Sequence, residues 1–252
     1  MTLACTALWA KSLPSPDEYA PGGEESRFTP GYSLAHHLLD VAAVAHELVS
    51  IIPCPVESPC SIEWAAILVG CHDLGKATPG FQEKWEPGRE HGFTAGFDYP
   101  PGAPDRHDAS TVPLLTDRLA RLGVARRTAS ALAQAVGAHH GNLIPPTELQ
   151  AAGRWRFTPT WCKAHDELFH IVRTSAAATG LPSLSADAPT RTAQLAWLMG
   201  LTTVADWIGS SDALCRPVRL AGAPPPDATW FKQSRMLART ALVEVGLTEQ
   251  SI

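Results

Sequence analysis

The sequence predicts an all-α protein, and three observations support this fold class. Apolar residues recur at steps of three and four over several long stretches, which is the period of an α-helix. The alternation of apolar and polar residues that marks half-buried strands is not evident in the sequence. Glycine and proline collect between the periodic stretches, where turns are needed. With 252 residues and 45% hydrophobic content, the chain can bury a substantial core.

The expected helices follow one another along the chain. In the first, apolar residues such as Leu34, Leu38, Val41 and Ala45 share one face, and Ser33 can cap the N-terminus. The same pattern predicts further helices over residues 61–72, 114–122, 127–139, 160–178, 190–208 and 231–245.

A long Gly/Pro-rich loop is expected between residues 79 and 106, near the polar cluster described below. Connections between elements usually span about four to six residues, so a segment of this length is unusual and often carries function. Its aromatic side chains could stack on nucleic-acid bases. They are Phe81, Trp85, Phe93, Phe97 and Tyr99.

The domain organisation is inferred from a second interruption. Residues 221–227 contain three consecutive prolines and indicate a linker into the last helix. We therefore expect one compact domain over residues 1–220. Residues 221–252 would form a linker and a C-terminal helix, which either packs on this domain or leads to a further one.

Composition limits the partners and the compartment. The formal net charge of −5 argues against a global basic field, so any attraction to phosphate must be local. Six cysteines without a CxxC pair are too sparse for a secreted disulfide framework. The apolar start lacks a basic leader, and no stretch reads as long and apolar enough to cross a bilayer. A cytoplasmic protein without a membrane partner is expected.

The pair His72-Asp73 is the most informative feature of the sequence. An apolar helical segment ends in these two residues and is stopped by Gly75, which places an imidazole and a carboxylate at a helix end. Adjacent residues on a helix diverge by roughly 100°. One divalent ion can therefore take both side chains only near such an end, or two ions can share the carboxylate.

Further metal-type side chains occur elsewhere in the chain. His37 is a candidate ligand, while Asp40, three residues later on the same helix face, is either a ligand or an acceptor that orients a histidine N–H. His139 and His140 precede Gly141, which can end their helix. Asp206 lies in an apolar helix, where a carboxylate needs a partner such as a cation.

Other candidates have equally good structural interpretations. His107 follows the long loop and begins a helix, so a ligand role and a surface role are both open. Lys76 either complements a helix end or contacts a phosphate. The tryptophans, including Trp64, Trp197 and Trp207, are assigned to the core. Four arginines are interpreted as a solvated face that could guide a polynucleotide: Arg118, Arg121, Arg126 and Arg127.

These residues resemble a known family. The order His37, His72-Asp73, Asp206 is similar to the H…HD…D signature of the HD phosphohydrolase superfamily. His107 and the doublet His139-His140 resemble the HD nuclease domain of the CRISPR-associated helicase-nuclease of type I systems. Local likenesses extend over almost the whole chain: Leu8-Trp9-Ala10-Lys11-Ser12, His72 to Lys76 with Phe81-Gln82, His139-His140-Gly141, and residues 204–209.

The resemblance implies a fold, an activity and partners. The fold would be an all-helical HD-domain bundle, and the activity a metal-dependent nuclease that cuts single-stranded DNA in type I CRISPR interference. The partners would be single-stranded DNA, a helicase domain or subunit, and a CRISPR surveillance complex. No GxxxxGK[ST] phosphate loop is present, so ATP-driven unwinding is not assigned to this chain. It would be either an excised domain or a separately encoded subunit.

The resemblance also implies the roles of the site residues. A first metal site would comprise His37, His72, Asp73 and Asp206. Asp73 would bridge to a second site with His107, His139 and His140, and Lys76 would face the scissile phosphate. His72, Asp73 and Lys76 are thus the candidate catalytic residues.

The expected chemistry is hydrolysis of a phosphodiester by water activated at one or two divalent ions. A histidine-rich set favours Mn, Fe, Co or Ni over Mg, with Zn possible. The enzyme alternative is an HD phosphohydrolase that acts on nucleotides or cyclic nucleotides. An alternative of another class is a non-catalytic domain that docks a helicase or surveillance complex.

Overall fold

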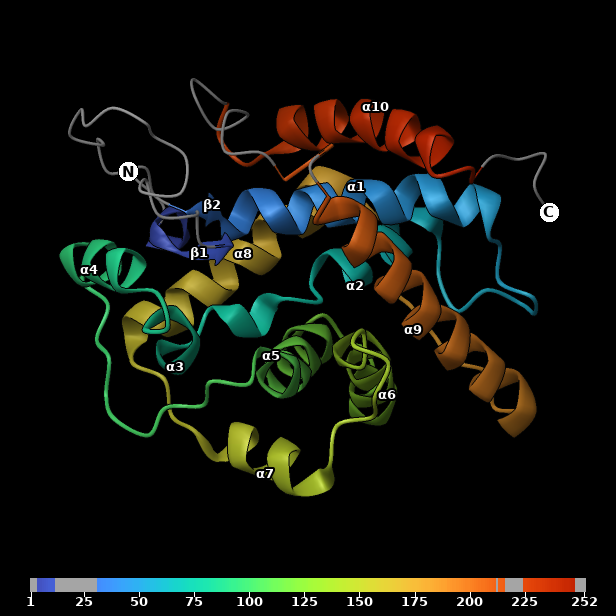
Figure 1. Cartoon of the computed structure of the whole chain (residues 1–252). Helices are drawn as coiled ribbons and strands as arrows, with labels where there is room; N and C mark the ends of the chain where they lie inside the picture. Colours follow the sequence, from blue (N-terminus) through green and yellow to red (C-terminus); the bar gives the residue numbers. More distant parts are fainter. Residues whose placement is uncertain (1–3, 12–30, 212, 216–223, 248–252) are drawn as a thin grey trace.

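The computed structural model describes residues 4–11, 31–211, 213–215 and 224–247. Helices dominate these residues, in agreement with the predicted all-α class (Figure 1). The helices are α1 (Leu34–Ile51), α2 (Ile62–Gly70), α3 (Pro79–Gln82), α4 (Glu86–Thr94), α5 (His107–Arg121), α6 (Arg126–Gly137), α7 (Pro146–Arg154), α8 (Pro159–Ala176), α9 (Ala188–Gly209) and α10 (Ala228–Glu244). Two short strands, β1 (Trp9–Lys11) and β2 (Tyr32–Ser33), pair antiparallel, and a 3₁₀ turn spans Leu74–Lys76.

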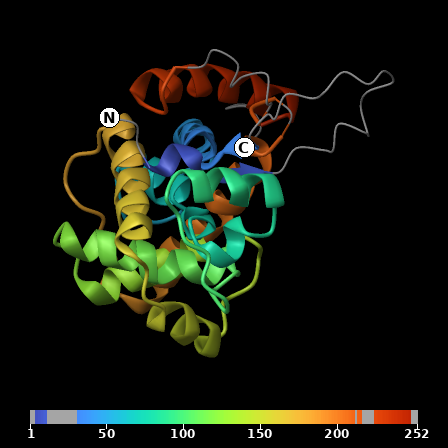
Figure 2. The same ribbon diagram turned by 90° about the vertical axis from the view of Figure 1, so that its left-hand side faces the viewer.

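Helix α1 is the centre of the fold. Every residue from Leu34 to Ala45 is buried, because α1 contacts α2, α8, α9 and α10. Figure 2 looks nearly along α1 and shows α10 lying over it. By length and composition α1 could span a membrane, so the expectation that no stretch is apolar enough was wrong for this helix. Its apolar window is 72% buried within the fold, as the core helix of a globular domain would be.

The segment predicted as a long loop contains two short helices. Thr78 caps α3 by accepting a hydrogen bond from the backbone N–H of Phe81, and proline occupies the first turn of both α3 and α4. Helices of four and nine residues that are rich in Gly and Pro carry too little periodicity to be recognised. Helix α7, also nine residues long, was not predicted either.

Helix α10 packs along α1 and is tied to it by polar contacts. Glu47 of α1 accepts hydrogen bonds from Arg235 and Arg239 of α10, at 2.6 and 2.7 Å. The buried carboxylate of Asp40 accepts from Trp230 and Ser234 of the same helix. Residues 221–223 of the predicted linker 221–227 lie outside the described residues, as does Ser12 of the N-terminal motif.

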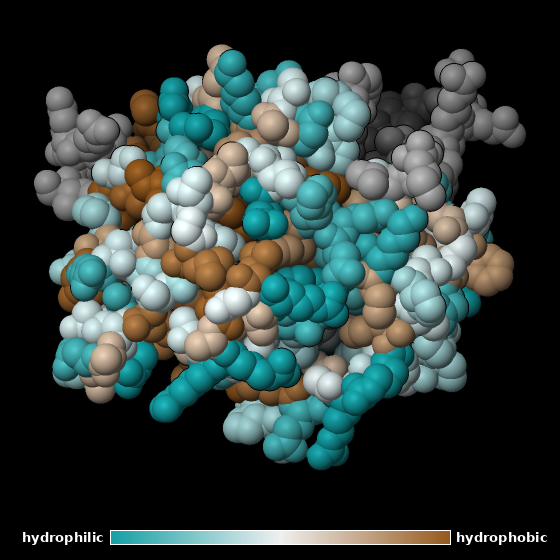
Figure 3. All heavy atoms as spheres, turned by 180° about the vertical axis from the view of Figure 1, so that it is seen from behind, coloured by the Kyte–Doolittle hydropathy of each residue, from teal (hydrophilic) through white to brown (hydrophobic). Residues whose placement is uncertain are grey.

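The molecular surface mixes residue types. Seen from behind, hydrophobic residues gather near the middle of one face, with hydrophilic residues around them (Figure 3). Two assignments from sequence were wrong. Trp207 is 71% exposed instead of buried in the core, and Arg118 is buried, where it contacts Asp166, instead of solvated.

Candidate metal centre

The turn after α2 presents the His72-Asp73 pair. Ser61 caps the start of α2 by accepting from the backbone N–H of Trp64, and the helix ends at Gly70. His72 and Asp73 then lie in the turn that leads into Leu74–Lys76. Because consecutive residues of a turn need not diverge as they do within a helix, both side chains point to the same place. They are almost completely buried.

Four predicted ligands form a first group. His37 comes from α1, Asp206 from α9, and His72 and Asp73 from the turn. Nε2 of His37 lies 3.1 Å and Nε2 of His72 lies 3.2 Å from Oδ2 of Asp73. His72 Nε2 also lies 3.2 Å from Oδ1 of Asp206. One ligand atom from each of the four residues lies within 4.8 Å of the others, so a single cation can contact them all.

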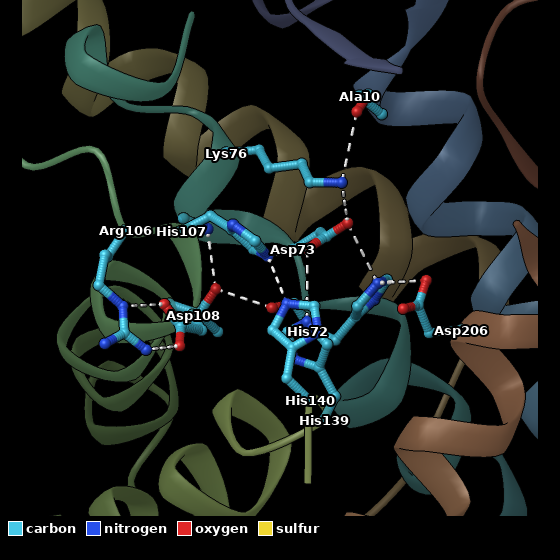
Figure 4. Close-up of polar contacts among 12 residues, drawn as sticks. Ala10, His72, Asp73, Lys76, Arg106, His107, Asp108, His139, His140 and Asp206 are labelled. Atoms are coloured by element: carbon cyan, nitrogen blue, oxygen red, sulfur yellow. Dashed lines mark hydrogen bonds and ion pairs between the residues drawn. The ribbon is translucent and has the colours of Figure 1, made fainter. Parts of the chain in front are cut away.

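Three further histidines form a second group on the other side of Asp73. His107 begins α5, and His139 and His140 follow the end of α6. Their ligand atoms also lie within 4.8 Å of one another, with 3.0 Å between Nε2 of His107 and Nε2 of His140. Oδ1 of Asp73 lies 3.4 Å from His107 and 3.8 Å from His139 (Figure 4). The two oxygens of Asp73 therefore face different groups.

His72 and His139 are held in the same way. Each lies two residues beyond the end of a helix, and each ring Nδ1 lies 3.1 Å from the carbonyl oxygen three residues earlier, at Val69 and Val136. A carbonyl can only accept, so in both neutral rings Nδ1 carries the proton and donates it. Nε2 then keeps its lone pair and faces the cluster, which is the tautomer that a metal ligand needs.

The pKa values of the cluster favour this protonation state for most of its members. Burial lowers the pKa of His37 and of His107 to about 4, and that of His139 to about 3. Burial also raises the pKa of Asp73, but His72 and Lys76 outweigh it and hold that pKa well below its usual range. The site thus offers neutral imidazoles and ionised carboxylate.

His72 differs from the other histidines. Burial lowers its pKa, but the carboxylates of Asp73 and Asp206 outweigh burial and raise the pKa to about 9. The same pair effect lowers the pKa of Asp206 against the effect of burial. Two carboxylates around one ring thus favour a positive charge at this position, and a divalent cation would satisfy that demand in place of the proton.

Unpaired polar atoms support the same conclusion. Nε2 of His72, Oδ1 of Asp73 and Nε2 of His139 are buried and have no hydrogen-bond partner in the part of the chain that the structure describes. Buried polar atoms without a partner are costly and need an explanation. All three point into the cluster, so the residues present fit one or two divalent ions.

Lys76 lies beside the first group. Its Nζ is 2.6 Å from Oδ2 of Asp73 and 3.3 Å from the carbonyl oxygen of Ala10 in β1 (Figure 4). The side chain is buried and also lies over the ring of Phe81, 5.5 Å from its centroid. Lys76 therefore contributes a fixed positive charge to the cluster.

All eight predicted site residues lie in this cluster: His37, His72, Asp73, Lys76, His107, His139, His140 and Asp206. Asp40 does not. Its carboxylate turns away to Tyr32, Trp230 and Ser234, so neither the ligand role nor the histidine-orienting role holds. Of the aromatic residues between 79 and 106, Phe81 and Phe97 are buried, which excludes them as stacking platforms, whereas Phe93 is 71% exposed.

Sequence reasoning missed the polar side chains that hold the backbone of the site. Gln82 is fully buried and donates to the carbonyl oxygens of Trp9 and Lys76, at 2.8 and 2.9 Å. Thr203 of α9 donates to the carbonyl oxygen of His139. Thr111 of α5 contacts the His72-Asp73 turn. Hydroxyl and amide groups inside helices carry no sequence signature of such a role.

The fold and the cluster define an all-helical protein with a histidine- and aspartate-rich cluster of the HD type that could hold metal ions. The chain belongs to the Cas3 HD domain family, whose family model matches residues 9–215. It is 32% identical to a CRISPR-associated endonuclease/helicase Cas3 of Thermus thermophilus, over 96% of this chain and 26% of that protein. The chain therefore spans about a quarter of the length of this relative.

Solved structures agree with this assignment. The Thermus thermophilus Cas3 HD domain, crystallised in the presence of Ni²⁺, matches with 30% identity and a TM-score of 0.65, covering 97% of this chain and 92% of that one. A CRISPR-associated protein matches with 25% identity and a TM-score of 0.74, covering 98% of this chain and 27% of that one. A CRISPR RNA-guided surveillance complex in a pre-nicking state shares the fold, with 24% identity and a TM-score of 0.61 over 88% of this chain and 27% of the matched chain.

Proposed function

We propose that this chain is a metal-dependent nuclease that hydrolyses phosphodiester bonds of single-stranded DNA in type I CRISPR interference. The observation that carries the proposal is the position of Asp73, whose two carboxylate oxygens face two separate groups of ligand-type side chains. A carboxylate shared in this way is the arrangement that a two-ion phosphodiesterase needs.

The proposed cofactor is one or two divalent transition-metal ions. His37, His72, Asp73 and Asp206 would hold the first, and His107, His139 and His140 with Asp73 the second. Imidazole ligands favour Mn, Fe, Co or Ni over Mg, with Zn possible. The related HD domain crystallised in the presence of Ni²⁺ supports this class of ion. Such ions supply an activated water and offset the negative charge of the phosphodiester.

The side chains of the chain prepare the site for an anion. Two divalent ions and two carboxylates leave a formal charge of about +2, although the protein as a whole is acidic. Lys76 adds a buried positive charge that is aimed at Asp73 and anchored on Ala10. A phosphate bound beside Asp73 would accept a hydrogen bond from this ammonium group. We therefore assign Lys76 to phosphate binding, and His72 and Asp73 to the catalytic centre.

The relatives support the proposed partners. The Thermus relative is an endonuclease/helicase nearly four times as long as the matched region, and another structural relative is part of a surveillance complex. We propose that this chain acts in the cytoplasm with a helicase domain or subunit and such a complex. Residues 1–220 would form the nuclease domain, and residues 221–252 the linker and a helix packed on it.

A cleavage assay with circular single-stranded DNA tests the proposal. Metal-free protein incubated with Mn²⁺ is expected to convert the circles to linear and shorter products, and Asp73→Ala is expected to abolish this conversion. The same reactions with a mononucleotide and a cyclic nucleotide serve as a comparison. Intact DNA with a hydrolysed nucleotide would identify a nucleotide phosphohydrolase instead. Intact DNA and intact nucleotides, with retained binding of a helicase, would identify a docking domain.

A further inference from the structure

Thr111 hydrogen-bonds to the turn that carries His72 and Asp73, although it is not one of the residues in either group of ligands. It is fully buried in α5, four residues after His107, so both residues lie on one face of the helix. Its Oγ1 donates to the carbonyl oxygen of His72 at 2.8 Å and accepts from the backbone N–H of Gly75 at 2.9 Å. One hydroxyl group thus pairs with both ends of the turn that carries Asp73.

The turn and α5 are also in direct backbone contact. A Cβ atom at Gly75 would lie 1.9 Å from the carbonyl oxygen of His107 and 2.6 Å from the backbone nitrogen of Thr111. No side chain fits in this space, so only glycine allows the approach. The backbone that carries Asp73 and the backbone that carries His107 therefore touch, and Thr111 is the side chain that hydrogen-bonds across the contact.

We propose that Thr111 is a positioning residue that fixes the separation of Asp73 from His107 and thereby determines whether one carboxylate can serve two cations. The proposal rests on the proposed function, because it takes each ligand group to hold an ion. Oδ1 of Asp73 lies 3.4 Å from Nε2 of His107, so a small displacement of the turn along α5 changes this separation. Without the hydroxyl, two buried backbone groups lose their partner and the turn shifts to satisfy them.

A matched pair of substitutions on α5 tests the inference. Thr111→Val keeps the volume of the side chain and removes both hydrogen bonds. Thr116→Val makes the same change five residues further along α5, where the buried Oγ1 has no hydrogen-bond partner among the described residues. Mn²⁺ binding to the full metal-free chain is measured by isothermal titration calorimetry. Melting temperatures are recorded in parallel.

The expected result separates the two variants. The unmodified chain and Thr116→Val bind two Mn²⁺ ions with the same affinities. In Thr111→Val one of the two binding events weakens by about tenfold or more, which is the typical effect of removing a group that orients metal ligands. Thr111→Ser, which keeps the hydroxyl, restores the affinity. In a His140→Ala background, which already lacks part of the second site, Thr111→Val has little further effect on Mn²⁺ binding.

A graded series covers the case in which Thr111→Val does not fold. Cysteine nearly matches threonine in volume but is a weaker donor and acceptor, so Thr111→Cys must weaken Mn²⁺ binding where Thr111→Ser does not. Equal Mn²⁺ affinities in the folded Thr111 and Thr116 variants would overturn the inference, as would an unmodified chain that binds a single Mn²⁺. Normal binding of two ions without DNA cleavage would instead overturn the proposed function and leave this inference standing.

Discussion

Nζ of Lys76 lies 2.6 Å from Oδ2 of Asp73, the same oxygen that faces His37 and His72. The contact joins two residues three positions apart across the turn, and the carbonyl oxygen of Ala10 anchors the other side of the ammonium group. Because the lysine side chain is already ordered, it loses little conformational entropy when a phosphate binds to it. This relationship leads to the first prediction.

Replacement of Lys76 by methionine is expected to reduce cleavage of single-stranded DNA by about a hundredfold, which is the usual effect of removing one preorganised charge donor. Mn²⁺ affinity is expected to stay the same or to rise, because a competing positive charge beside Asp73 is lost. Single-turnover cleavage and Mn²⁺ titration measure the two effects.

Lys84 supplies the control for this experiment. It also lies over Phe81, 5.3 Å from the ring centroid, but its side chain is 44% exposed and pairs with Asp105. Lys84→Met is expected to cleave DNA normally. Unchanged cleavage in Lys76→Met would contradict the phosphate-binding role.

Metal binding is expected to stabilise the fold. The buried ligand atoms of His72, Asp73 and His139 gain partners when a cation binds, and the unfolded chain lacks this arrangement. A ligand at a hundred times its dissociation constant contributes about 2.7 kcal/mol. For a chain of this size, that corresponds to a rise in melting temperature of roughly 5–10 °C.

Differential scanning calorimetry with and without Mn²⁺ measures this rise. EDTA is expected to reverse it, and Asp73→Asn to abolish it. A melting temperature that does not respond to Mn²⁺, Ni²⁺ or EDTA would argue against an internal metal centre.

Asp40 is expected to matter for stability and not for metal binding. Its buried carboxylate accepts hydrogen bonds from Tyr32, Trp230 and Ser234, which tie β2 and α10 to α1. Asp40→Asn replaces one acceptor oxygen by an NH₂ group that cannot accept. We expect a loss of about 1–3 kcal/mol in the free energy of unfolding.

Urea unfolding measures the stability of Asp40→Asn, and calorimetry measures its Mn²⁺ stoichiometry, which is expected to equal that of the unmodified chain. A lost Mn²⁺ site in a folded Asp40→Asn protein would show that Asp40 supports the metal centre after all.

The pH dependence of stability can be predicted for His165, which lies outside the metal cluster. Burial and nearby Arg118 lower its pKa from 6.5 to about 3, despite the carbonyl oxygen of Ala77 beside its Nε2. Between pH 3 and 6.5 the unfolded chain therefore binds a proton at this residue and the folded chain does not. Stability consequently falls as the pH is lowered through this window.

Substitution of His165 by glutamine removes up to one proton from the difference in proton binding between the unfolded and folded chains. The slope of the free energy of unfolding against pH is then expected to fall by up to about 1.4 kcal/mol per pH unit. Urea unfolding of metal-free protein at pH 7, 6 and 5 measures the slope, and the histidines of the metal cluster cancel in the comparison. His170→Gln, at an exposed position of the same helix, is the control. Equal slopes for His165→Gln and the unmodified chain would contradict the account.

The class of fold and the members of the cluster could be predicted from the sequence, and the reasons are physical. Long helices such as α1 and α9 carry enough apolar periodicity to be recognised, and helix ends such as those at His72 and His139 present side chains into shared space. The resemblance to a known family then grouped residues that are far apart in the chain, such as His37 and Asp206.

Other features depend on neighbours that a sequence does not reveal. Asp40 shares a helix face with His37, but helix positions three apart still differ by roughly 60°, and α10 supplies the donors that draw Asp40 away. Trp207 immediately follows Asp206, a member of the first ligand group. Trp207 is nevertheless exposed, because no element of the described chain covers it. The role of Thr111 depends on a contact between α5 and a turn 36 positions earlier, and no local pattern encodes it.

The central claim is that Asp73 lies between two cation sites. Anomalous diffraction from crystals of the protein soaked in Mn²⁺ tests it most directly. The account predicts two anomalous peaks, one among His37, His72 and Asp206 and one among His107, His139 and His140, with an oxygen of Asp73 coordinated to each. A single peak that does not involve Asp73, or no peak among these residues, would contradict it.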